Sequence, residues 1–115
     1  MDIIHEDTID IWIAQNHASE ALLWSWRNVT KEANWTSPND IKQSFPKASI
    51  ITVKLGTIPP DTTRVIFNIG SARLVTHVKF KSNLEGWAGC VFLRWFGSHA
   101  AYDKIDWTIS EETNI

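Results

Sequence analysis

Apolar residues in the first half of the chain recur at helical spacing. Ile9, Trp12 and Ile13 lie three and four positions apart, which places them on one face of a helix that Asp7 can cap. The pattern also predicts a second helix over residues 19–33. The apolar stripe of this second helix consists of Leu22, Trp26, Val29 and Ala33.

A short third helix is predicted to begin after Ser37. Ser37 can cap this helix, and Pro38 suits the first helical position because the N–H that proline lacks would have no partner there. Ile41 and Phe45 share one face, and Pro46 ends the helix.

The second half of the chain is rich in β-branched and apolar runs that predict strands. Gly70 and Ser71 separate two of them and are typical of a tight hairpin turn. The last of these runs, over residues 90–96, is nearly all apolar, which places it centrally in the sheet. The predicted strands cover residues 50–55, 64–69, 72–81 and 90–96, and Ile3 with Ile4 is compatible with a short first strand. Helices followed by an antiparallel meander predict an α+β fold.

Length and composition limit the alternatives. The 115 residues fit one domain over residues 1–115, with 43% hydrophobic and 21% charged residues as in ordinary globular proteins. The start, MDIIHEDTID, has no basic segment or long apolar run, so we expect no signal peptide, no membrane span and a cytoplasmic location. A single cysteine excludes an internal disulfide and a cysteine-based zinc site. No metalloprotease, P-loop or dinucleotide-binding motif is present, and we expect no metal and no cofactor.

The net charge of −2 argues mildly against nucleic-acid binding, because phosphate affinity comes mainly from lysine and arginine. A local basic stripe can outweigh the total charge. The seven tryptophans divide between predicted core positions and four that we expect to be partly exposed and available to RNA bases or a protein partner. These four are Trp24, Trp35, Trp87 and Trp107.

One predicted strand carries such a basic stripe. Side chains alternate between the two faces of a strand, so Arg73, Val75, His77, Lys79 and Lys81 share one face of the strand over residues 72–81. The opposite face is apolar core. The basic face has two interpretations, a solvated outer surface or a groove for RNA phosphates.

Arg94 lies among apolar neighbours in the last predicted strand. An unpaired buried charge is costly, so this side chain requires a partner or an open site. Two alternatives are equally supported: an internal ion pair, for which Asp103 is a candidate, and an open cleft that holds an anion.

The segment GSHAAYD then brings together three chemically useful residues. Gly97 is expected to break the strand, and a helical turn after it would place His99, Tyr102 and Asp103 on one face. This grouping suits acid–base chemistry. The alternative is structural, with His99 capping the turn and Asp103 paired with Lys104 or with the arginine of the preceding strand.

Three blocks resemble the HigB branch of the RelE-type toxins: SPNDIKQSFPKAS, RVIFNIG followed by ARLV, and VFLRWFGSHAAYDKIDW. They keep their order from residue 37 to residue 107. The resemblance implies N-terminal helices packed on one face of a small curved antiparallel sheet, with RNA on the other face. It also implies an mRNA interferase, a metal-independent endoribonuclease that cleaves mRNA on the ribosome, and a HigA-like helix-turn-helix antitoxin as partner.

The resemblance also assigns roles to residues. Metal-free cleavage uses the ribose 2′-OH as nucleophile on the adjacent phosphate. Arg73 and Arg94 would position that phosphate and offset its charge. His99 and Tyr102 would transfer protons or orient the 2′-OH, since an unperturbed imidazole exchanges its proton near neutral pH, and Asp103 would orient His99 or cap the turn. Further RNA contacts are expected from Arg64, His77, Lys79, Lys81 and Lys104.

The chain also departs from the pattern of this family. Its hairpin is about two residues shorter between the glycine and Arg73, an even number that keeps Arg73 on the same face. The loop over residues 82–89 is longer, residues 50–63 fit the pattern poorly, and the charge is acidic where the family is commonly basic. The alternative functions are a non-catalytic RelE-like module that binds an antitoxin or RNA without cleaving it, and an unrelated small-molecule-binding domain.

Overall fold

Five strands form one sheet in the computed structural model, which describes residues 1–54 and 56–115. The strands are β1 (Asp2–Ile4), β2 (Ser49–Ile51), β3 (Thr63–Ile69), β4 (Ala72–Lys79) and β5 (Cys90–Ser98), in the order β1-β5-β4-β3-β2. The hairpin of β3 and β4 is confirmed, with Gly70 at a φ of 61° that glycine adopts without strain.

Two expectations about the strands are wrong. The sheet is mixed rather than antiparallel, because β1 runs parallel to β5, although the central place of β5 is confirmed, since it lies between β1 and β4. The strand predicted over residues 50–55 ends at Ile51, before the turn of the following loop, and its last position, Leu55, lies outside the described residues.

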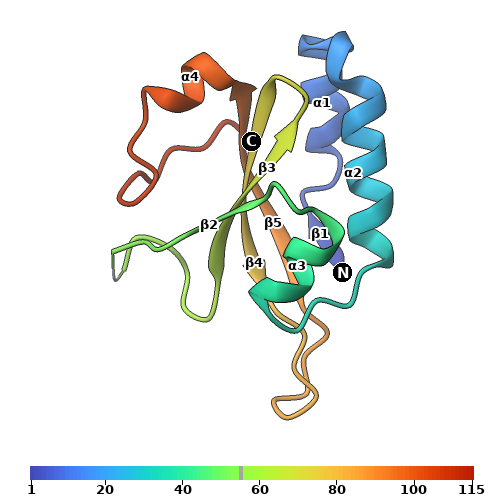
Figure 1. Cartoon of the computed structure of the whole chain (residues 1–115), viewed down its shortest axis with the longest axis vertical. Coiled ribbons are helices and arrows are strands. Elements are labelled where there is room, and N and C mark those ends of the chain that lie inside the picture. Colours follow the sequence, from blue (N-terminus) through green and yellow to red (C-terminus); the bar gives the residue numbers. More distant parts are fainter. Residues whose placement is uncertain (55) are drawn as a thin grey trace.

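The helices divide between the two faces of the sheet. Figure 1 shows α1 and α2 packed on one side, whereas α4 and the C-terminal chain lie on the other. Among residues 1–54 and 56–115, no helix is long and apolar enough to cross a bilayer. The helical elements are α1 (Thr8–Gln15), a 3₁₀ turn (His17–Ser19), α2 (Glu20–Glu32), α3 (Pro38–Ser44) and α4 (His99–Asp103).

The first two predicted caps form no side-chain hydrogen bond. Asp7 occupies the N-cap of α1 but has a helical backbone (φ −62°, ψ −20°), whereas a capping side chain needs an extended one. Ser37 is extended at the start of α3, yet its hydroxyl makes no capping bond. The carboxylate of Asp40 instead accepts hydrogen bonds from the main-chain N–H and the hydroxyl of Thr36.

The buried face of α2 differs from the predicted stripe. Leu23, Trp26 and Thr30 are buried, whereas Leu22 and Val29 are 48% and 40% exposed. Only Trp26 belongs to both sets. The apolar residues of this helix cover a broad arc, and contact with the sheet rather than spacing decides which part of the arc is buried.

Aromatic rings fill the core between the helices and the first face of the sheet. Trp26 contacts Phe67 of β3 edge-on at 5.4 Å between ring centroids, and Trp12 contacts Phe96 of β5 at 5.5 Å. Trp35, which we expected to be partly exposed, is buried there and stacks on Phe67. Burial of such large rings contributes most of the hydrophobic stabilisation of a small domain.

A β-bulge in β5 brings two consecutive side chains to the second face of the sheet. Val75 pairs with Trp95 while its neighbour Thr76 pairs with Leu93, so Arg94 is the extra residue. Leu93 belongs to the helix-side core, whereas Trp95 belongs to the core of the second face. The Nε of Arg94 is buried, and the positive charge of Arg94 helps to lower the pKa values of Arg64 and His77.

Gly97 does not break β5, which continues to Ser98. Its lack of a side chain makes room for a neighbour instead. A Cβ at position 97 would lie 2.6 Å from the Trp95 ring, so only glycine lets this ring lie across the strand.

The C-terminal chain covers part of the second face. Trp107, which we expected to be partly exposed, is buried with Ile66, Val75 and Trp95 in a second core. Asn114 then binds β5: its side-chain amide accepts from the Phe96 N–H at 3.0 Å and donates to the Phe96 carbonyl at 2.7 Å. The interpretation of this face as a solvated outer surface is wrong for Val75 and His77, which are buried, whereas Arg73, Lys79 and Lys81 are partly exposed.

Two adjacent leucines test which face of α2 is buried. Leu23→Ala removes a fully buried side chain and is expected to lower the free energy of unfolding by about 2–5 kcal/mol. Leu22→Ala removes a half-exposed side chain and is expected to cost less than about 1 kcal/mol. Urea denaturation followed by tryptophan fluorescence measures both, and equal losses would contradict this packing.

Candidate functional site

The candidate site lies where β4 and β5 meet α4. Arg73 of β4 pairs across the sheet with Gly97 of β5, one residue before the strand ends. Ser98 then caps α4, because its hydroxyl accepts a hydrogen bond from the Ala101 N–H at 3.1 Å. This cap starts the helix at His99, which confirms the predicted helical turn and shows that His99 itself does not cap it.

His99, Tyr102 and Asp103 lie together on α4. His99 Nε2 is 3.2 Å from Asp103 Oδ1, and both side chains are more than half exposed. The rings of His99 and Tyr102 lie 6.4 Å apart. The alternatives in which Asp103 pairs with Lys104 or Arg94 are therefore wrong, because the carboxylate is one turn away from the imidazole and pairs with it.

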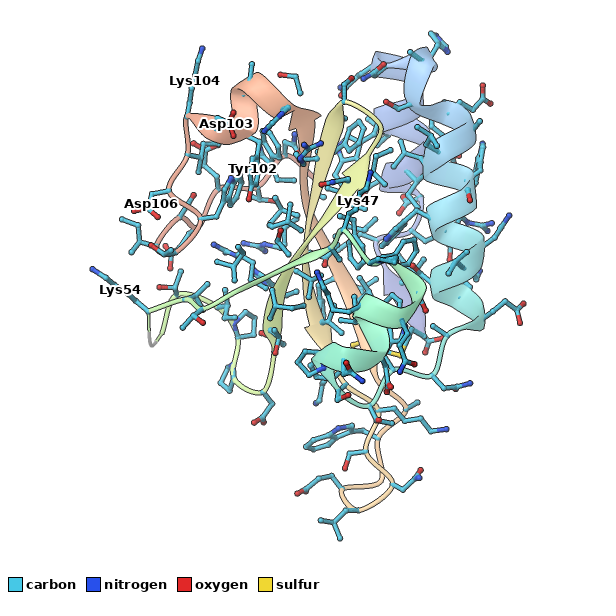
Figure 2. All side chains as sticks on the ribbon, in the orientation of Figure 1. Lys47, Lys54, Tyr102, Asp103, Lys104 and Asp106 are labelled. Carbon is cyan, nitrogen blue, oxygen red and sulfur yellow. The ribbon has the colours of Figure 1, made fainter. Side chains whose placement is uncertain are left out.

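Tyr102 lies between α4 and the strands (Figure 2) and is half-buried. Its ring stacks on Trp107 at 5.7 Å with an interplanar angle of 15°. Burial raises the pKa of Tyr102, because it disfavours the phenolate, while the positive charge of Arg73 partly opposes this shift. The phenol is therefore protonated at neutral pH and can donate a hydrogen bond.

Arg64 and His77 form a buried pair on the same face. Each residue is only 1% exposed. Arg64 Nε and Nη2 lie 3.2 and 3.0 Å from His77 Nε2, and Arg64 Nη1 donates to the Trp107 carbonyl at 2.6 Å. Burial, reinforced by the charges of Arg64 and Arg94, lowers the pKa of His77 to about 3. The expectation of a titratable histidine in an exposed basic stripe is therefore wrong, because this imidazole is buried against Arg64 of β3, which in turn bonds the C-terminal chain.

Three arginines of the second face have no carboxylate partner within the described residues. Arg73 donates only to the main-chain carbonyls of Gly70 and Ala72. The Arg94 Nε is buried without a hydrogen-bond partner. The predicted internal ion pair of Arg94 is thus wrong, and the site carries more positive than negative charge.

The predicted lysines lie away from this cluster. Lys79 is six residues from Arg73 along β4, or about 20 Å, and its ammonium lies 4.2 Å from the Trp87 ring centroid. Lys81 follows beyond the strand, where its main-chain N–H donates to the Trp35 carbonyl. Lys104 extends outward from the end of α4, away from the sheet (Figure 2). The predicted residues therefore divide into one cluster near α4 and separate lysines.

The sequence named Trp107 only as a partly exposed ring available to RNA bases or a protein partner and did not indicate a place in this site. The structure shows that it joins Arg64 to Tyr102. In the part of the chain that the structure describes, no group of three or more His, Cys, Asp or Glu residues could hold a metal ion.

Comparison with known protein families supplies an independent observation. Residues 19–105 match the HigB toxin family, described as the RelE-like toxic component of a toxin–antitoxin system. The match covers well over half of the chain. This chain belongs to the HigB toxin family. A comparison with curated proteins gives no significant match.

Membership in the HigB family makes the protein a toxin-type component whose family implies an antitoxin partner. The matched residues include α2, the whole β3–β4 hairpin, β5 and α4. The match ends at residue 105, so Trp107 and the C-terminal chain that covers the second face lie outside it. The site is thus a HigB-family sheet and helix closed by a segment beyond the matched region.

The burial of His77 predicts a pH-dependent stability. Its folded-state pKa of about 3 lies below the ordinary value of 6.5, so between these values the unfolded chain binds a proton that the folded protein excludes. The contribution of neutral His77 to the free energy of unfolding is complete above pH 6.5 and is lost as the pH falls toward 3. At pH 5 the loss is about 2 kcal/mol. His77→Gln should lose less stability than wild type between pH 7 and pH 5.

Urea denaturation at both pH values measures this difference. Carboxylates also contribute to acid sensitivity, so the comparison between variants is decisive rather than the wild-type slope alone. His17→Gln is the matched control, because His17 is exposed. If the free energy of unfolding of His77→Gln fell with pH as steeply as that of wild type, His77 would not be excluded from protonation in the folded protein.

Proposed function

We propose that this HigB-family protein is a metal-independent endoribonuclease that cleaves mRNA on translating ribosomes in the cytoplasm. One observation carries the proposal: within the described residues the arginines beside α4 have no carboxylate partner, and His99 and Tyr102 lie next to them. Excess positive charge suits a phosphate chain, and the adjacent imidazole and phenol suit proton transfer on it.

Arg73 is the principal phosphate ligand in this proposal. Its side chain is partly exposed and bonds only main-chain carbonyls, so donors remain for a phosphoryl oxygen. Arg94 is more enclosed, with Nε buried, and adds positive potential from the floor of the site. Fixed guanidinium groups stabilise the negative charge that develops on phosphorus oxygens during the reaction.

His99 and Tyr102 divide the proton transfers. His99 is exposed, and Asp103 at 3.2 Å orients its imidazole, so His99 is the proposed base for the 2′-OH. The raised pKa of Tyr102 makes it a poor base, so its phenol donates a hydrogen bond to the reacting phosphate. The role of His99 follows from its exposure and its contact with Asp103, and that of Tyr102 follows from its raised pKa.

The proposed step is balanced without a metal or cofactor. The 2′-oxygen bonds to phosphorus as its proton passes to His99, and the bond from phosphorus to the 5′-oxygen breaks. The leaving 5′-oxygen then takes a proton from the imidazolium or from water. The products are a 2′,3′-cyclic phosphate and a 5′-hydroxyl.

The family implies an antitoxin but does not state its type. We propose a HigA-like helix-turn-helix protein, as the sequence resemblance implies. The non-catalytic alternative remains an outcome of the tests below. It predicts that the protein binds RNA or antitoxin while mRNA stays intact.

Substitutions in the site should abolish toxicity. His99→Ala is expected to slow cleavage by about 10²–10⁴-fold, the usual range for a lost acid–base group. Arg73→Ala is expected to cost about 10²–10³-fold through lost charge stabilisation. Asp103→Asn should slow cleavage less, because Asp103 only orients His99. Growth after induction without antitoxin, and primer extension on a translated mRNA, measure both effects.

Lys47→Ala is the matched control, since it removes one exposed positive charge on the loop between α3 and β2. It is expected to leave cleavage at the wild-type level. Full toxicity in both His99→Ala and Arg73→Ala would contradict the site assignment. Intact mRNA with wild-type protein, combined with antitoxin binding, would favour the non-catalytic module.

The chemistry of the cut ends provides a second prediction. Cleavage in a cell-free translation reaction should leave a 2′,3′-cyclic phosphate, which mass spectrometry of the fragments identifies. Cleavage of purified ribosome–mRNA complexes should survive treatment with EDTA followed by back-addition of only the Mg²⁺ that ribosomes need. Fragments with 5′-phosphate ends would contradict 2′-OH attack, since hydrolysis by water would then be required.

A further inference from the structure

We propose that Arg64, His77 and Trp107 are positioning residues that hold Tyr102 in the site and do not contact RNA themselves. This inference rests on the proposed function for the role of Tyr102. The sequence pattern placed Arg64 and His77 among the RNA contacts, and their geometry points to a different role.

The helix that carries Tyr102 is too short to be stable without contacts to the rest of the protein. α4 has five residues, none of them buried, and isolated helices of this length are unstable. Tyr102 is half-buried and makes the aromatic contacts of this helix with the second core, through Trp95 and Trp107. The orientation of Tyr102 therefore depends on the residues packed against it.

Trp107 contacts Tyr102 in two ways. The two rings are nearly parallel, 5.7 Å apart, and the indole Nε1 donates to the Tyr102 carbonyl at 3.1 Å. The first contact holds the phenol ring, and the second holds the main chain of α4. Trp107 is itself held against Trp95 at 5.2 Å between centroids.

Arg64 anchors Trp107 to the sheet. It donates to the Trp107 carbonyl at 2.6 Å, and its guanidinium carbon lies 5.6 Å from the centroid of the Trp107 ring. A guanidinium in a buried site is costly unless its donors are bonded. All three nitrogens of the guanidinium contact His77 or the Trp107 carbonyl, so its donors point into the protein.

His77 completes the support as an acceptor. Two nitrogens of Arg64 converge on His77 Nε2, which must be unprotonated to accept from them. A neutral imidazole thus takes the place that a carboxylate usually holds. The chain of contacts runs from His77 on β4 through Arg64 on β3 to Trp107 and then to Tyr102.

Tyr102 offers a direct spectroscopic readout, because it is the only tyrosine in the chain. The rise in ultraviolet absorbance on phenol ionisation reports this residue alone. The charged groups that affect its titration are Arg73 on β4, Arg64 on β3 and Asp103 on α4, and the ring of His99 lies 6.4 Å from its own. Circular dichroism at each pH verifies that the protein remains folded.

Loosening the support should expose the phenol to water and stabilise the phenolate. Trp107→Leu is expected to titrate at lower pH than wild type, closer to the ordinary tyrosine pKa near 10. Trp107→Phe keeps a ring against Tyr102 and should remain close to wild type. Arg64→Lys keeps the positive charge but not the paired donors, so it should shift in the same direction as Trp107→Leu.

Trp87→Leu is the control, because Trp87 lies in the loop between β4 and β5, where it contacts Lys79. It removes a tryptophan without touching the support and should leave the titration unchanged. If Trp107→Leu does not fold, Arg64→Lys gives the same test, with Trp107→Phe as the variant expected to titrate like wild type.

Cleavage kinetics provide a second readout. Because misplacement of a reacting group by about 1 Å can cost 10²-fold, Arg64→Lys and Trp107→Leu should lower kcat about 10- to 100-fold. KM should stay within about twofold, since RNA binding is unaffected. A direct RNA contact by Arg64 would instead raise KM and reduce the salt dependence of binding.

An unchanged Tyr102 titration in both Trp107→Leu and Arg64→Lys would overturn the inference, as would a raised KM with unchanged kcat. The titration needs no RNA and no cleavage. A wild-type protein that fails to cleave mRNA would therefore count against the proposed function, while the titration would still decide whether this support holds Tyr102.

Discussion

The hydrogen bonds of the buried Arg64 guanidinium join three parts of the molecule: β3, β4 and the C-terminal chain. A buried positive charge without bonded donors would cost several kcal/mol, so its partners must be in place whenever the protein is folded. A neutral His77 is the acceptor on one side and the Trp107 carbonyl on the other. This constraint keeps His77 unprotonated and holds the C-terminal chain over the second face.

The same face is shaped by the bulge in β5. One extra residue turns both Arg94 and Trp95 toward the second face, so a guanidinium and a large ring lie side by side on consecutive residues. Gly97 then leaves space for the Trp95 ring, and α4 begins two residues later. The result is a second aromatic core beneath α4, bordered by arginines for which residues 1–54 and 56–115 supply no carboxylate partner.

Much of the fold could be predicted because it depends on local patterns. The spacing of Ile9, Trp12 and Ile13 identified α1, and Gly70 located the turn between β3 and β4. The buried face of α2 was predicted wrongly, with Leu22 in place of Leu23, because a broad apolar arc does not say which edge meets the sheet. The parallel pairing of β1 with β5 was also missed, since it joins residues almost 90 positions apart.

For the candidate site, the sequence by itself determined the grouping of His99, Tyr102 and Asp103, because a single helical turn sets their spacing. The three sequence blocks also indicated the family that the comparison confirmed. Only the tertiary structure decided that Arg64 and His77 are buried, that Arg94 lies at a bulge, and that Trp107 stacks on Tyr102. Alternation along a strand shows which side chains share a face but not what covers that face. The cover here comes from the C-terminal chain, 43 residues from Arg64, and no periodicity within β3 or β4 records its presence.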